Sequence, residues 1–515
     1  MFLHEIIEFA ARAHPDDPAL IGEGHTWTFA EMWDRVTSMA GAISRRTSRG
    51  DRVVIISENS PAMVAALYAL PLAGTVATFA NTRHTPSEIA ELIRATEPSL
   101  VLASAVQMSK LVDTIEFDAI TARLSVETEL LEDFAGPIDG RPGEKSDRTT
   151  PARVARLGAD SDCAWLIHTS GTTGRAKGAV LTHRSLISAV MNTAVARPLS
   201  DDDVYLFPFP LFHVAAYNVL HSHIRRRPVV LVPGFDPAQV LSLIESERVT
   251  SCSLAPTMLS MLLDHPDRGS RDLSSLRQVS YGAASMPLDL ILRVEHELPG
   301  CGLAQGYGMT ELSGNAVFLT PADHDRARTT DPHLLAAAGR PGPLVALRIV
   351  GEDDRDVAPG EPGEILVRGD QVCDGYWNAP EETSGSLLDG WFRTGDIGRV
   401  DPEGVLDVVD RKKDLIISGG ENVSSREVED LLSTHPHVAQ VAVVGLPDQR
   451  WGEKVCAVVV ASRDNADALE IVDWTKGRIA GFKRPRAVFF SDSLPTNASG
   501  KVDKVALRMT FESAP

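Results

Sequence analysis

Residues 229–263 alternate between short apolar runs and helix-like patterns. Val229 to Val232 is an apolar run typical of a strand, and Asp236 then offers an N-cap that is followed by a proline at the first helical position. Ser251 to Leu254 predicts a second strand, and Pro256 to Leu263 predicts a second helix. This β-α-β-α order with short connections predicts an α/β layer architecture with parallel strands.

From about residue 344 the pattern changes to short alternating segments separated by Gly, Pro and Asp, which predicts a smaller β-rich subdomain. Its strands are expected at Leu347–Val350, Glu364–Val367 and Val405–Val409. A capping box at Ser424–Glu427 begins the first helix of a terminal α+β unit of roughly 100 residues. We therefore expect a large N-terminal domain over residues 1–410, whose β-rich subdomain spans about 344–410, and a small C-terminal domain over 414–515, joined by a hinge at 411–413.

One uncharged stretch, Pro61 to Ala80, is about as long as a membrane-spanning helix. Pro71 and Gly74 interrupt it, and its two halves are typical of a short Ala/Leu helix followed by a Thr/Val/Phe strand. We therefore interpret it as a buried helix and strand, and expect no integral membrane span.

The composition excludes several classes of protein. A formal net charge of −20 and a pI near 5.2 argue against nucleic acid as a partner. The five cysteines show no spacing typical of a zinc site or a disulfide framework, which fits a reducing compartment. The N-terminus lacks the basic and apolar regions of a secretory signal, so a cytoplasmic location is expected.

The segment His168 to Gly178 combines three glycines, several hydroxyl side chains, Arg175 and Lys177. Glycines let the backbone approach an anion closely, and the hydroxyls and cations can bind phosphate oxygens. The spacing is not that of the common nucleotide-binding P-loop. Its composition alone leaves two interpretations open, a phosphate-binding loop and a flexible Ser/Thr/Gly linker.

Further motifs follow in order and decide between these interpretations. Together with the loop they resemble the adenylate-forming superfamily of acyl-CoA synthetases, peptide-synthetase adenylation domains and firefly-type luciferases. The resemblance spans nearly the whole chain and rests on Phe207–His213, Tyr281–Ala284, Gln305–Glu311, Gly363–Gly369, Trp391–Asp396, Asp410–Asn422 and Leu494–Lys501. Ala176, where the family usually has proline, and His168, where it has Tyr or Phe, depart from the pattern.

The resemblance implies an acid–thiol ligase that uses ATP, Mg²⁺ and coenzyme A. Glu311 would bind Mg²⁺, Thr310 would contact the α-phosphate, Tyr307 would stack on adenine, and Asp396 would accept the ribose hydroxyls. Lys501 would bridge the substrate carboxylate and the α-phosphate. The implied nucleotide-binding set is Thr169, Ser170, Gly171, Thr172, Thr173, Gly174, Lys177, Gly282, Ala283, Ala284, Gln305, Gly306, Tyr307, Gly308, Thr310, Asp396, Arg411 and Lys501. Taken singly, Glu311 or Asp396 would be interpreted as a solvated carboxylate and Lys501 as a surface lysine.

Thioester formation implies a second arrangement. In the superfamily the C-terminal domain rotates after adenylation, and matching positions place the pivot at Lys413 and the turn that meets pantetheine at Gly419 and Gly420. Trp451, Phe482 and Arg484 match coenzyme A contacts of aryl-CoA ligases. We therefore expect a mobile C-terminal domain and domain alternation.

The acyl pocket is expected at His213, Val214, Ala215, Ala216, Gly306, Ser313 and Gly314. The resemblance places His213, as a catalytic candidate with Lys501, Thr310 and Glu311, at the acyl and thiol end, although a core histidine is the alternative. Amino-acid-activating members carry an aspartate after the Phe-Pro-Leu segment, and none stands here, so the substrate lacks an α-ammonium group. The small residues predict an unblocked tunnel, which favours a medium- or long-chain fatty acid over an aromatic acid.

Several alternatives stay open. An aryl-CoA ligase, an acyl-carrier-protein ligase, a luciferase-like oxygenase and a catalytically silent adenylate-binding sensor share parts of the pattern, although intact Lys501 and Glu311 argue against the sensor. Arg225 to Arg227 offers weak peripheral contact with an anionic membrane, with a solvated loop as the alternative. A homodimer is among the oligomeric states that the sequence allows.

Overall fold

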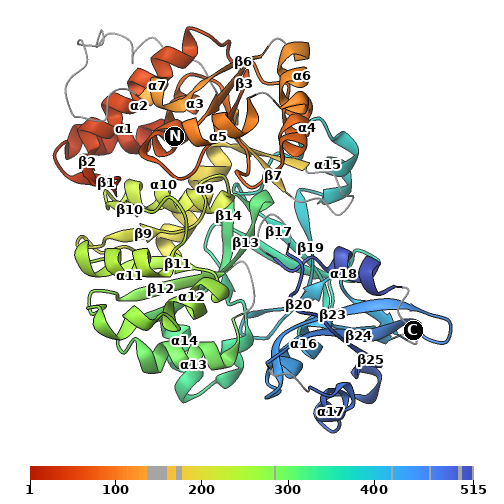
Figure 1. Cartoon of the computed structure of the whole chain (residues 1–515). Helices are drawn as coiled ribbons and strands as arrows, with labels where there is room; N and C mark the ends of the chain where they lie inside the picture. The colour runs from red at the N-terminus through yellow and green to blue at the C-terminus, as the bar shows by residue number, and fades with distance from the viewer. Residues whose placement is uncertain are drawn as a thin grey trace. The chain divides into compact units, whose positions relative to one another are not determined.

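The computed structural model describes residues 1–112, 114–124, 126–135, 159, 161–169, 177–282, 286–418, 421–462, 466–496 and 501–512. The chain divides into two compact units. Unit 1 comprises Met1–Leu347 and Val367–Phe392, and unit 2 comprises Arg348–Leu366 and Arg393–Pro515. The predicted α/β class, with a large N-terminal and a small C-terminal part, is confirmed (Figure 1).

Unit 1 contains two sheets. The larger runs in the order β15 (Arg340–Pro341), β14 (Gly314–Leu319), β13 (Gly302–Met309), β12 (Gln278–Gly282), β11 (Ser251–Leu254), β9 (Tyr205–Phe207), β10 (Val229–Leu231), β1 (Pro18–Gly22), β2 (His25–Thr28). The other runs β6 (Glu127–Leu130), β5 (Leu100–Ala103), β3 (Arg52–Ile56), β4 (Val76–Phe79), β7 (Cys163–Thr169), β8 (Lys177–Thr182). The inner strands pair in parallel, and β2, β8, β14 and β15 pair antiparallel to their neighbours.

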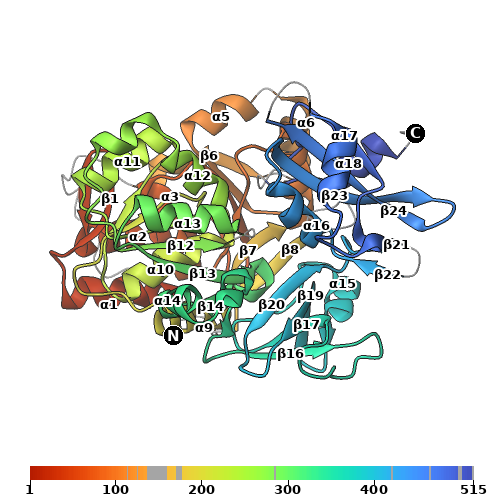
Figure 2. The ribbon, with the colours of Figure 1, turned by 90° about the horizontal axis from the view of Figure 1, so that it is seen from below.

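Helices cover these sheets in layers, as the apolar clusters show (Figures 1 and 2). Between the two sheets lie α1 (Leu3–Ala13), α2 (Phe29–Ser44), α3 (Pro61–Leu72), α9 (His183–Ala196) and α10 (Tyr217–Ile224). The outer face of the larger sheet carries α11 (Pro237–Ser246), α12 (Pro256–Leu263) and α13 (Leu288–Glu297). The outer face of the other carries α4 (Pro86–Thr96), α5 (Ala105–Leu111) and α6 (Ile115–Leu124). Further elements of unit 1 are α7 (Leu131–Ala135), α14 (Pro321–Thr329), α15 (Pro380–Ser386), η1 (Val214–Ala216), η2 (Pro266–Ser270), η3 (Thr310–Leu312) and η4 (Pro332–Ala336).

The predicted β-α-β-α segment is confirmed as β10, α11, β11 and α12. Asp236 caps α11 by accepting a hydrogen bond from the Gln239 amide at 2.8 Å. The strands β10 and β11 are not neighbours, because β9 lies between them and pairs in parallel with each. The sequence pattern predicts the direction of the strands, and this insertion of an earlier strand decides their order.

The stretch Pro61–Ala80 forms the buried helix α3 and the strand β4, as predicted. Ser60 caps α3 through the Met63 amide, and every residue of the helix is buried in the layer between the two sheets. Within the described ranges, no helix combines the length and the apolar character that crossing a membrane requires.

The three arginines Arg225–Arg227 lie directly after α10. Arg227 donates to the Arg225 carbonyl oxygen at 2.9 Å, and its guanidinium is 4.0 Å from the Asp201 carboxylate. Arg226 has a positive φ of 57°, so the segment is a tight reversal. Contact of this segment with a membrane stays a prediction.

Unit 2 contains most of a sheet with the order β16 (Ala346–Val350), β17 (Gly363–Arg368), β19 (Trp391–Val400), β18 (Leu387–Leu388), in which β20 (Leu406–Arg411) also pairs with β19. The chain passes between the two units within β16, β17 and β19. The predicted β-rich segments match β16, β17 and β20. The predicted domain boundary at residue 410 and the hinge at 411–413 fall inside unit 2 and stay predictions.

A second sheet of unit 2 has the order β22 (Glu421–Val423), β21 (Ile416–Ser418), β24 (Gly452–Ala461), β23 (Val438–Asp448), with β25 (Ala487–Phe490) paired to β24. The helices α16 (Ser425–Ser433) and α17 (Ala468–Trp474) pack on one face, and α18 (Lys504–Phe511) packs on the other. The short turn η5 (Gly481–Lys483) precedes β25. Ser424 caps α16 through the Glu427 amide, as the capping box predicts.

Candidate active site

The sequence motif Gln305–Glu311 occupies the end of β13 and the short helix η3 in unit 1. Two of its glycines, Gly306 and Gly308, lie so close to neighbouring atoms that a side chain would not fit. A Cβ on Gly308 would lie 2.1 Å from the Gly314 carbonyl oxygen, and one on Gly306 would lie 2.1 Å from the Asn315 amide nitrogen. The antiparallel pair β13–β14 shifts register between Tyr307 and Gly308, where Tyr307 stays half-buried. This shift ends the regular strand immediately before Thr310 and Glu311.

Gly282, at the end of β12, pairs in register with Gly306. A Cβ on Gly282 would lie 2.6 Å from the Gly306 carbonyl oxygen, so the two motifs meet backbone to backbone. Gly282, a member of the predicted nucleotide-binding set, therefore lies beside the strand that carries Tyr307. Ala283 and Ala284 lie outside the described residues.

The two ends of the phosphate-loop motif meet in the antiparallel pair β7–β8, in which Thr169 pairs with Lys177. The intervening Ser170, Gly171, Thr172, Thr173 and Gly174 lie outside the described residues. His168 carries no charge at neutral pH, since burial, with a smaller contribution from His84, lowers its pKa to about 4. At the described ends of the loop, positive charge therefore comes from Lys177.

Glu311 is held by a residue that the sequence motifs did not indicate. The Tyr376 hydroxyl donates to Glu311 Oε1 at 3.0 Å, and the Cys373 amide donates to the Glu311 carbonyl oxygen at 2.8 Å. The Lys177 ammonium lies 5.5 Å from the centre of the Tyr376 ring. Lys177, Tyr376 and Glu311, which come from three distant segments, are thereby brought together.

Burial and a neighbouring charge keep the Tyr376 phenol in its protonated form. Burial, and next the Glu311 carboxylate, raise the pKa of Tyr376 well above its usual value, so the phenol stays protonated and remains the donor. Its bond engages one carboxylate oxygen of Glu311. The other oxygen suits a hard divalent cation, because Mg²⁺ is bound through one or two carboxylates and phosphate oxygens. The geometry at Glu311 fits the predicted metal ligand.

Tyr376 is positioned by backbone pairing along β8. The Asp374 amide donates to the Val180 carbonyl oxygen at 3.0 Å, and the Trp377 amide donates to Gly178 at 2.8 Å. The sequence Asp374-Gly375-Tyr376-Trp377 indicates a turn with two aromatics, and no spacing rule relates it to Glu311, which lies 65 residues earlier.

We expect Tyr376→Phe to weaken Mg²⁺ binding at Glu311 without disturbing the fold, because only the hydroxyl is lost. Outer hydrogen-bond partners of metal ligands typically contribute at least ~10-fold to metal affinity or activity. Pyrophosphate release titrated with Mg²⁺ measures the effect, and Tyr68→Phe, which removes a buried hydroxyl bonded to His223, serves as the matched control. An unchanged Mg²⁺ titration in Tyr376→Phe would contradict the role.

The predicted acyl-pocket residues lie on two neighbouring segments of unit 1. His213 precedes η1, is half-buried and lies 4.5 Å from the Phe212 ring, measured between ring centres. Val214 and Ala215 are half-buried, and Ala216 is buried. The following Tyr217 contacts Gly314, since a Cβ on that glycine would lie 3.0 Å from the Tyr217 ring.

Ser313 and Gly314 are small because they pack closely. Ser313 is fully buried, and its hydroxyl donates to the Ser185 hydroxyl at 2.9 Å. The space beside Gly314 is filled by Tyr217, and the space beside Gly306 by Asn315. These positions therefore face packed side chains, which removes the main argument from the sequence for a long open tunnel.

In unit 2, Asp396 and Arg411 form an ion pair on adjacent strands. They are paired in register on β19 and β20, and Arg411 Nε lies 2.7 Å from Asp396 Oδ1. The Asp396 side chain is buried, whereas that of Arg411 is 45% exposed. The family resemblance implies separate nucleotide contacts for the two residues. In the structure they form one ion pair.

The turn that contains Lys413 follows β20 directly. Next to it, buried Asp410 accepts hydrogen bonds from the Ser425 amide at 2.6 Å and the Ser425 hydroxyl at 2.8 Å. Lys504 in turn donates to the Ser425 hydroxyl and pairs with Glu429 at 2.8 Å. Sequence reasoning missed this network, which ties β20 to α16 and α18.

The predicted coenzyme A residues share unit 2 but differ in their surroundings. The guanidinium of Arg486 lies 3.9 Å from the centre of the Trp451 ring, and Arg450 lies 4.9 Å from it. Arg484 donates to the Thr475 hydroxyl and the Val472 carbonyl oxygen on α17, and Phe482 is 36% exposed. Lys501 is exposed, and Gly419 and Gly420 lie outside the described residues. Arg486, which lies over the Trp451 ring, is therefore a further, cationic candidate for binding coenzyme A.

Comparison with known proteins decides the family. Residues 7–377 match the family described as AMP-binding enzyme, and residues 427–501 match the AMP-binding enzyme C-terminal domain. The chain belongs to the AMP-binding enzyme family. Its members are adenylate-forming enzymes, and this chain is an acid–thiol ligase of the ATP-dependent acyl- and aryl-CoA ligase type.

Relatives of this AMP-binding enzyme include proteins with different acids in their names. A feruloyl-CoA synthase of an Amycolatopsis species is 39% identical over 97% of both chains. A long-chain-fatty-acid–CoA ligase of Mycobacterium tuberculosis is 33% identical over 90% of this chain and 89% of the relative. The solved structure of O-succinylbenzoate coenzyme A synthetase of Bacillus subtilis in complex with ATP and magnesium ion has a TM-score of 0.84 at 30% identity, covering 99% of each chain.

Proposed function

We propose that this AMP-binding enzyme converts a carboxylic acid, ATP and coenzyme A into an acyl-CoA, AMP and pyrophosphate through an acyl-adenylate. The observation that carries the proposal is Glu311, held by Tyr376 beside Lys177 at the end of the loop motif. A carboxylate that attacks the α-phosphate of ATP brings two anions together, so cations must neutralise charge before the bond forms. This cluster supplies a lysine and a carboxylate suited to a magnesium ion.

In the first step a carboxylate oxygen of the acid attacks the α-phosphorus, and the bond to pyrophosphate breaks. Lys177 and the adjoining loop bind the β- and γ-phosphates. Glu311 would hold a magnesium ion, which would supply positive charge to the departing pyrophosphate. Thr310 contacts the α-phosphate, and Tyr307 stacks on adenine. Asp396, oriented by Arg411, accepts the ribose hydroxyls, and Lys501 bridges the carboxylate and the α-phosphate.

In the second step the thiol sulfur of coenzyme A attacks the acyl carbon, and AMP leaves. The proposal places a rotation about Lys413 between the steps, which withdraws Lys501 and brings Gly419 and Gly420 toward pantetheine. Trp451, Phe482 and Arg484 contact coenzyme A. A thiol with a pKa of about 8.5 is mostly protonated at neutral pH, so its proton passes to solvent, and orientation against a reactive anhydride replaces a dedicated base.

The acid lacks an α-ammonium group, because no carboxylate follows the Phe-Pro-Leu segment to pair with one. For its other end we favour a compact aromatic or cyclic acid over a long chain, since Ser313 and Gly314 are closely packed. The feruloyl-CoA synthase is consistent with this choice. The medium- or long-chain fatty acid stays as the second candidate, which the long-chain ligase of Mycobacterium tuberculosis supports.

A panel of acids tests the proposal. Acids from acetate to palmitate, benzoates and cinnamates are supplied with ATP and Mg²⁺, and pyrophosphate release and coenzyme A consumption are both measured. We expect acid-dependent pyrophosphate release and thioester formation, with cinnamates ahead of palmitate. Holo-acyl-carrier protein as the alternative acceptor separates a carrier ligase from a coenzyme A ligase. Absence of pyrophosphate release with every acid would contradict the proposed function.

A further inference from the structure

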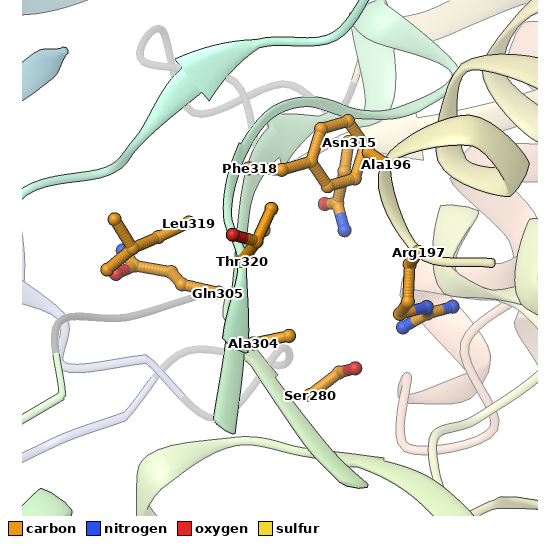
Figure 3. A pocket seen from close by; sticks show the side chains of 10 residues that line it. Ala196, Arg197, Ser280, Ala304, Gln305, Asn315, Phe318, Leu319 and Thr320 are labelled. Atoms are coloured by element: carbon orange, nitrogen blue, oxygen red, sulfur yellow. The ribbon is translucent and has the colours of Figure 1, made fainter. Parts of the chain in front are cut away.

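A small cavity lies on the inner face of the larger sheet, beside the predicted acyl pocket. Its lining includes Ser280 on β12, Ala304 and Gly306 on β13, and Asn315 on β14, with Arg197 at the end of α9 on the opposite side. Figure 3 shows Arg197 across the cavity from Asn315, Ala304 and Ser280, while Gln305 and Leu319 point to the other side of the strands. Gly306 belongs both to this lining and to the predicted acyl pocket.

The two faces of this sheet have opposite characters. Ser253, Ser280 and Ala304 are paired across β11, β12 and β13, so their side chains share the inner face. The residues that precede each of them, Cys252, Val279 and Leu303, belong to the apolar core under α11–α13. A row of small side chains, two of them polar, therefore lies where a β-sheet packed against helices normally carries large apolar residues.

The row faces a buried arginine, Arg197, whose hydrogen-bond partners among the described residues are neutral. Arg197 is 9% exposed, and it donates to Asn218 Oδ1 at 2.6 Å and, more weakly, to the Ser253 hydroxyl at 3.4 Å. Its third partner is His221 Nδ1 at 3.3 Å. Burial, and next the charge of Arg197, lower the pKa of His221 well below its usual value, so this ring is neutral. The hydrogen bonds orient the guanidinium without neutralising it.

Among the residues that the structure describes, no carboxylate lies within 4.0 Å of the Arg197 guanidinium. Burial of a charge is costly unless an opposite charge or several strong acceptors compensate it. Arg393, by comparison, does have such compensation, because its guanidinium lies 2.8 Å from the buried Glu364 carboxylate. An oxygen acceptor brought into the cavity by a ligand would supply what Arg197 lacks.

The cavity offers further hydrogen-bond donors to such an oxygen. The Ser280 hydroxyl accepts a hydrogen bond from the Gln278 side-chain Nε2 at 3.2 Å, which leaves its own proton available as a donor. The Asn315 amide lies beside Gly306, and any side chain at position 306 would collide with it. The cavity is too small for a chain or a ring, so it suits the terminal group of a ligand.

We propose that the acid carries an oxygen acceptor at the end remote from the reacting carboxyl, bound by Arg197 with Ser280 and Asn315. The acceptor is a carboxylate, a carbonyl or a phenolic oxygen. This inference rests on the proposed function and specifies its substrate class. Arg197 is then a specificity-determining residue, and a saturated hydrocarbon end leaves its charge uncompensated.

Matched pairs of acids test the proposal. Octanoate is compared with suberate and 7-oxo-octanoate, and cinnamate with 4-hydroxycinnamate, so that the arms separate a carboxylate, a carbonyl and a phenol. We expect at least one oxygen-bearing acid to exceed its unsubstituted partner at least ~10-fold in kcat/KM, because a site built to bind an oxygen rejects an analogue that lacks it. In Arg197→Met this ratio falls to near one, and in Arg197→Lys it is partly restored.

Arg12→Met, which changes an arginine whose side chain is 72% exposed, is the matched control and keeps the wild-type ratio. If Arg197→Met does not fold, Ser280→Ala replaces it and is expected to reduce the ratio. Calorimetric affinity for the same acids without ATP gives a readout that does not need turnover. Equal affinity and equal kcat/KM for both members of every pair would overturn the inference, whereas loss of pyrophosphate release with all acids would contradict the proposed function instead.

Discussion

Lys501→Ala is expected to lose acid-dependent pyrophosphate release by ~10²- to 10³-fold while it still forms thioester from supplied acyl-adenylate. The ammonium stabilises charge that develops between the carboxylate and the α-phosphate, and removal of one such group typically costs this much. In the second step the negative charge develops on the acyl carbonyl oxygen and on departing AMP, and the proposal withdraws Lys501 before this step. Pyrophosphate release from acid and ATP is measured beside coenzyme A consumption from synthetic acyl-adenylate.

Lys476→Ala is the matched control, because this lysine is also in unit 2 and its side chain is 58% exposed and pairs with Asp473 on the surface. We expect it to retain both half-reactions. If Lys501→Ala lowered both half-reactions equally, the assignment of this lysine to adenylation alone would be wrong, and a general role in binding AMP would replace it.

The second large effect is expected for Glu311→Gln, which removes the negative charge and keeps an oxygen that can accept from Tyr376. Because the fold and the hydrogen bond are preserved, the loss reports on the metal ligand. We expect adenylation to fall ~10²- to 10³-fold at a fixed Mg²⁺ concentration, since charge on the departing pyrophosphate is no longer neutralised. A titration with Mg²⁺ is expected to shift to higher concentration.

Glu91→Gln, at an exposed position of α4, supplies the control and is expected to keep the wild-type titration. A Glu311→Gln enzyme with normal activity and normal Mg²⁺ dependence would remove Glu311 from the site. In that case the cluster with Tyr376 and Lys177 would be a structural contact.

Local rules account well for the parts of the fold that depend on neighbouring residues. The caps at Asp236 and Ser424 begin the predicted helices because each side chain accepts a hydrogen bond from the backbone amide three residues later. The breakers Pro71 and Gly74 separate a helix from a strand for equally local reasons: Pro71 falls in the last turn of α3, and Gly74 takes a positive φ directly after it.

Contacts between distant segments were not predictable in this way. Tyr376 reaches Glu311 because residues 373–377 pair with β8, and neither segment carries a pattern that specifies the other. The same holds for Asp410. Its hydrogen-bond donor Ser425 looks, in the sequence, like part of an ordinary helix start. The resemblance to a family supplied candidate residues, and the structure supplied the side chains that orient them.

Small residues show another limit of sequence patterns. The sequence predicts Ser313 and Gly314 as part of the wall of an open tunnel, because a small side chain indicates free volume. In the structure that volume is filled by Ser185 and Tyr217, which lie more than 90 positions away. Size alone therefore does not separate an empty space from a closely packed one.

The contrasting faces of β11–β13 affect how the substrate range of this enzyme can evolve. Positions 252, 279 and 303 maintain the apolar core, while the adjacent positions 253, 280 and 304 face Arg197. In the proposed site, substitutions at the second set alter which acid is accepted while the apolar contacts under α11–α13 are kept. New substrate ranges can therefore arise by single substitutions on one side of the strands, with the apolar residues on the other side unchanged.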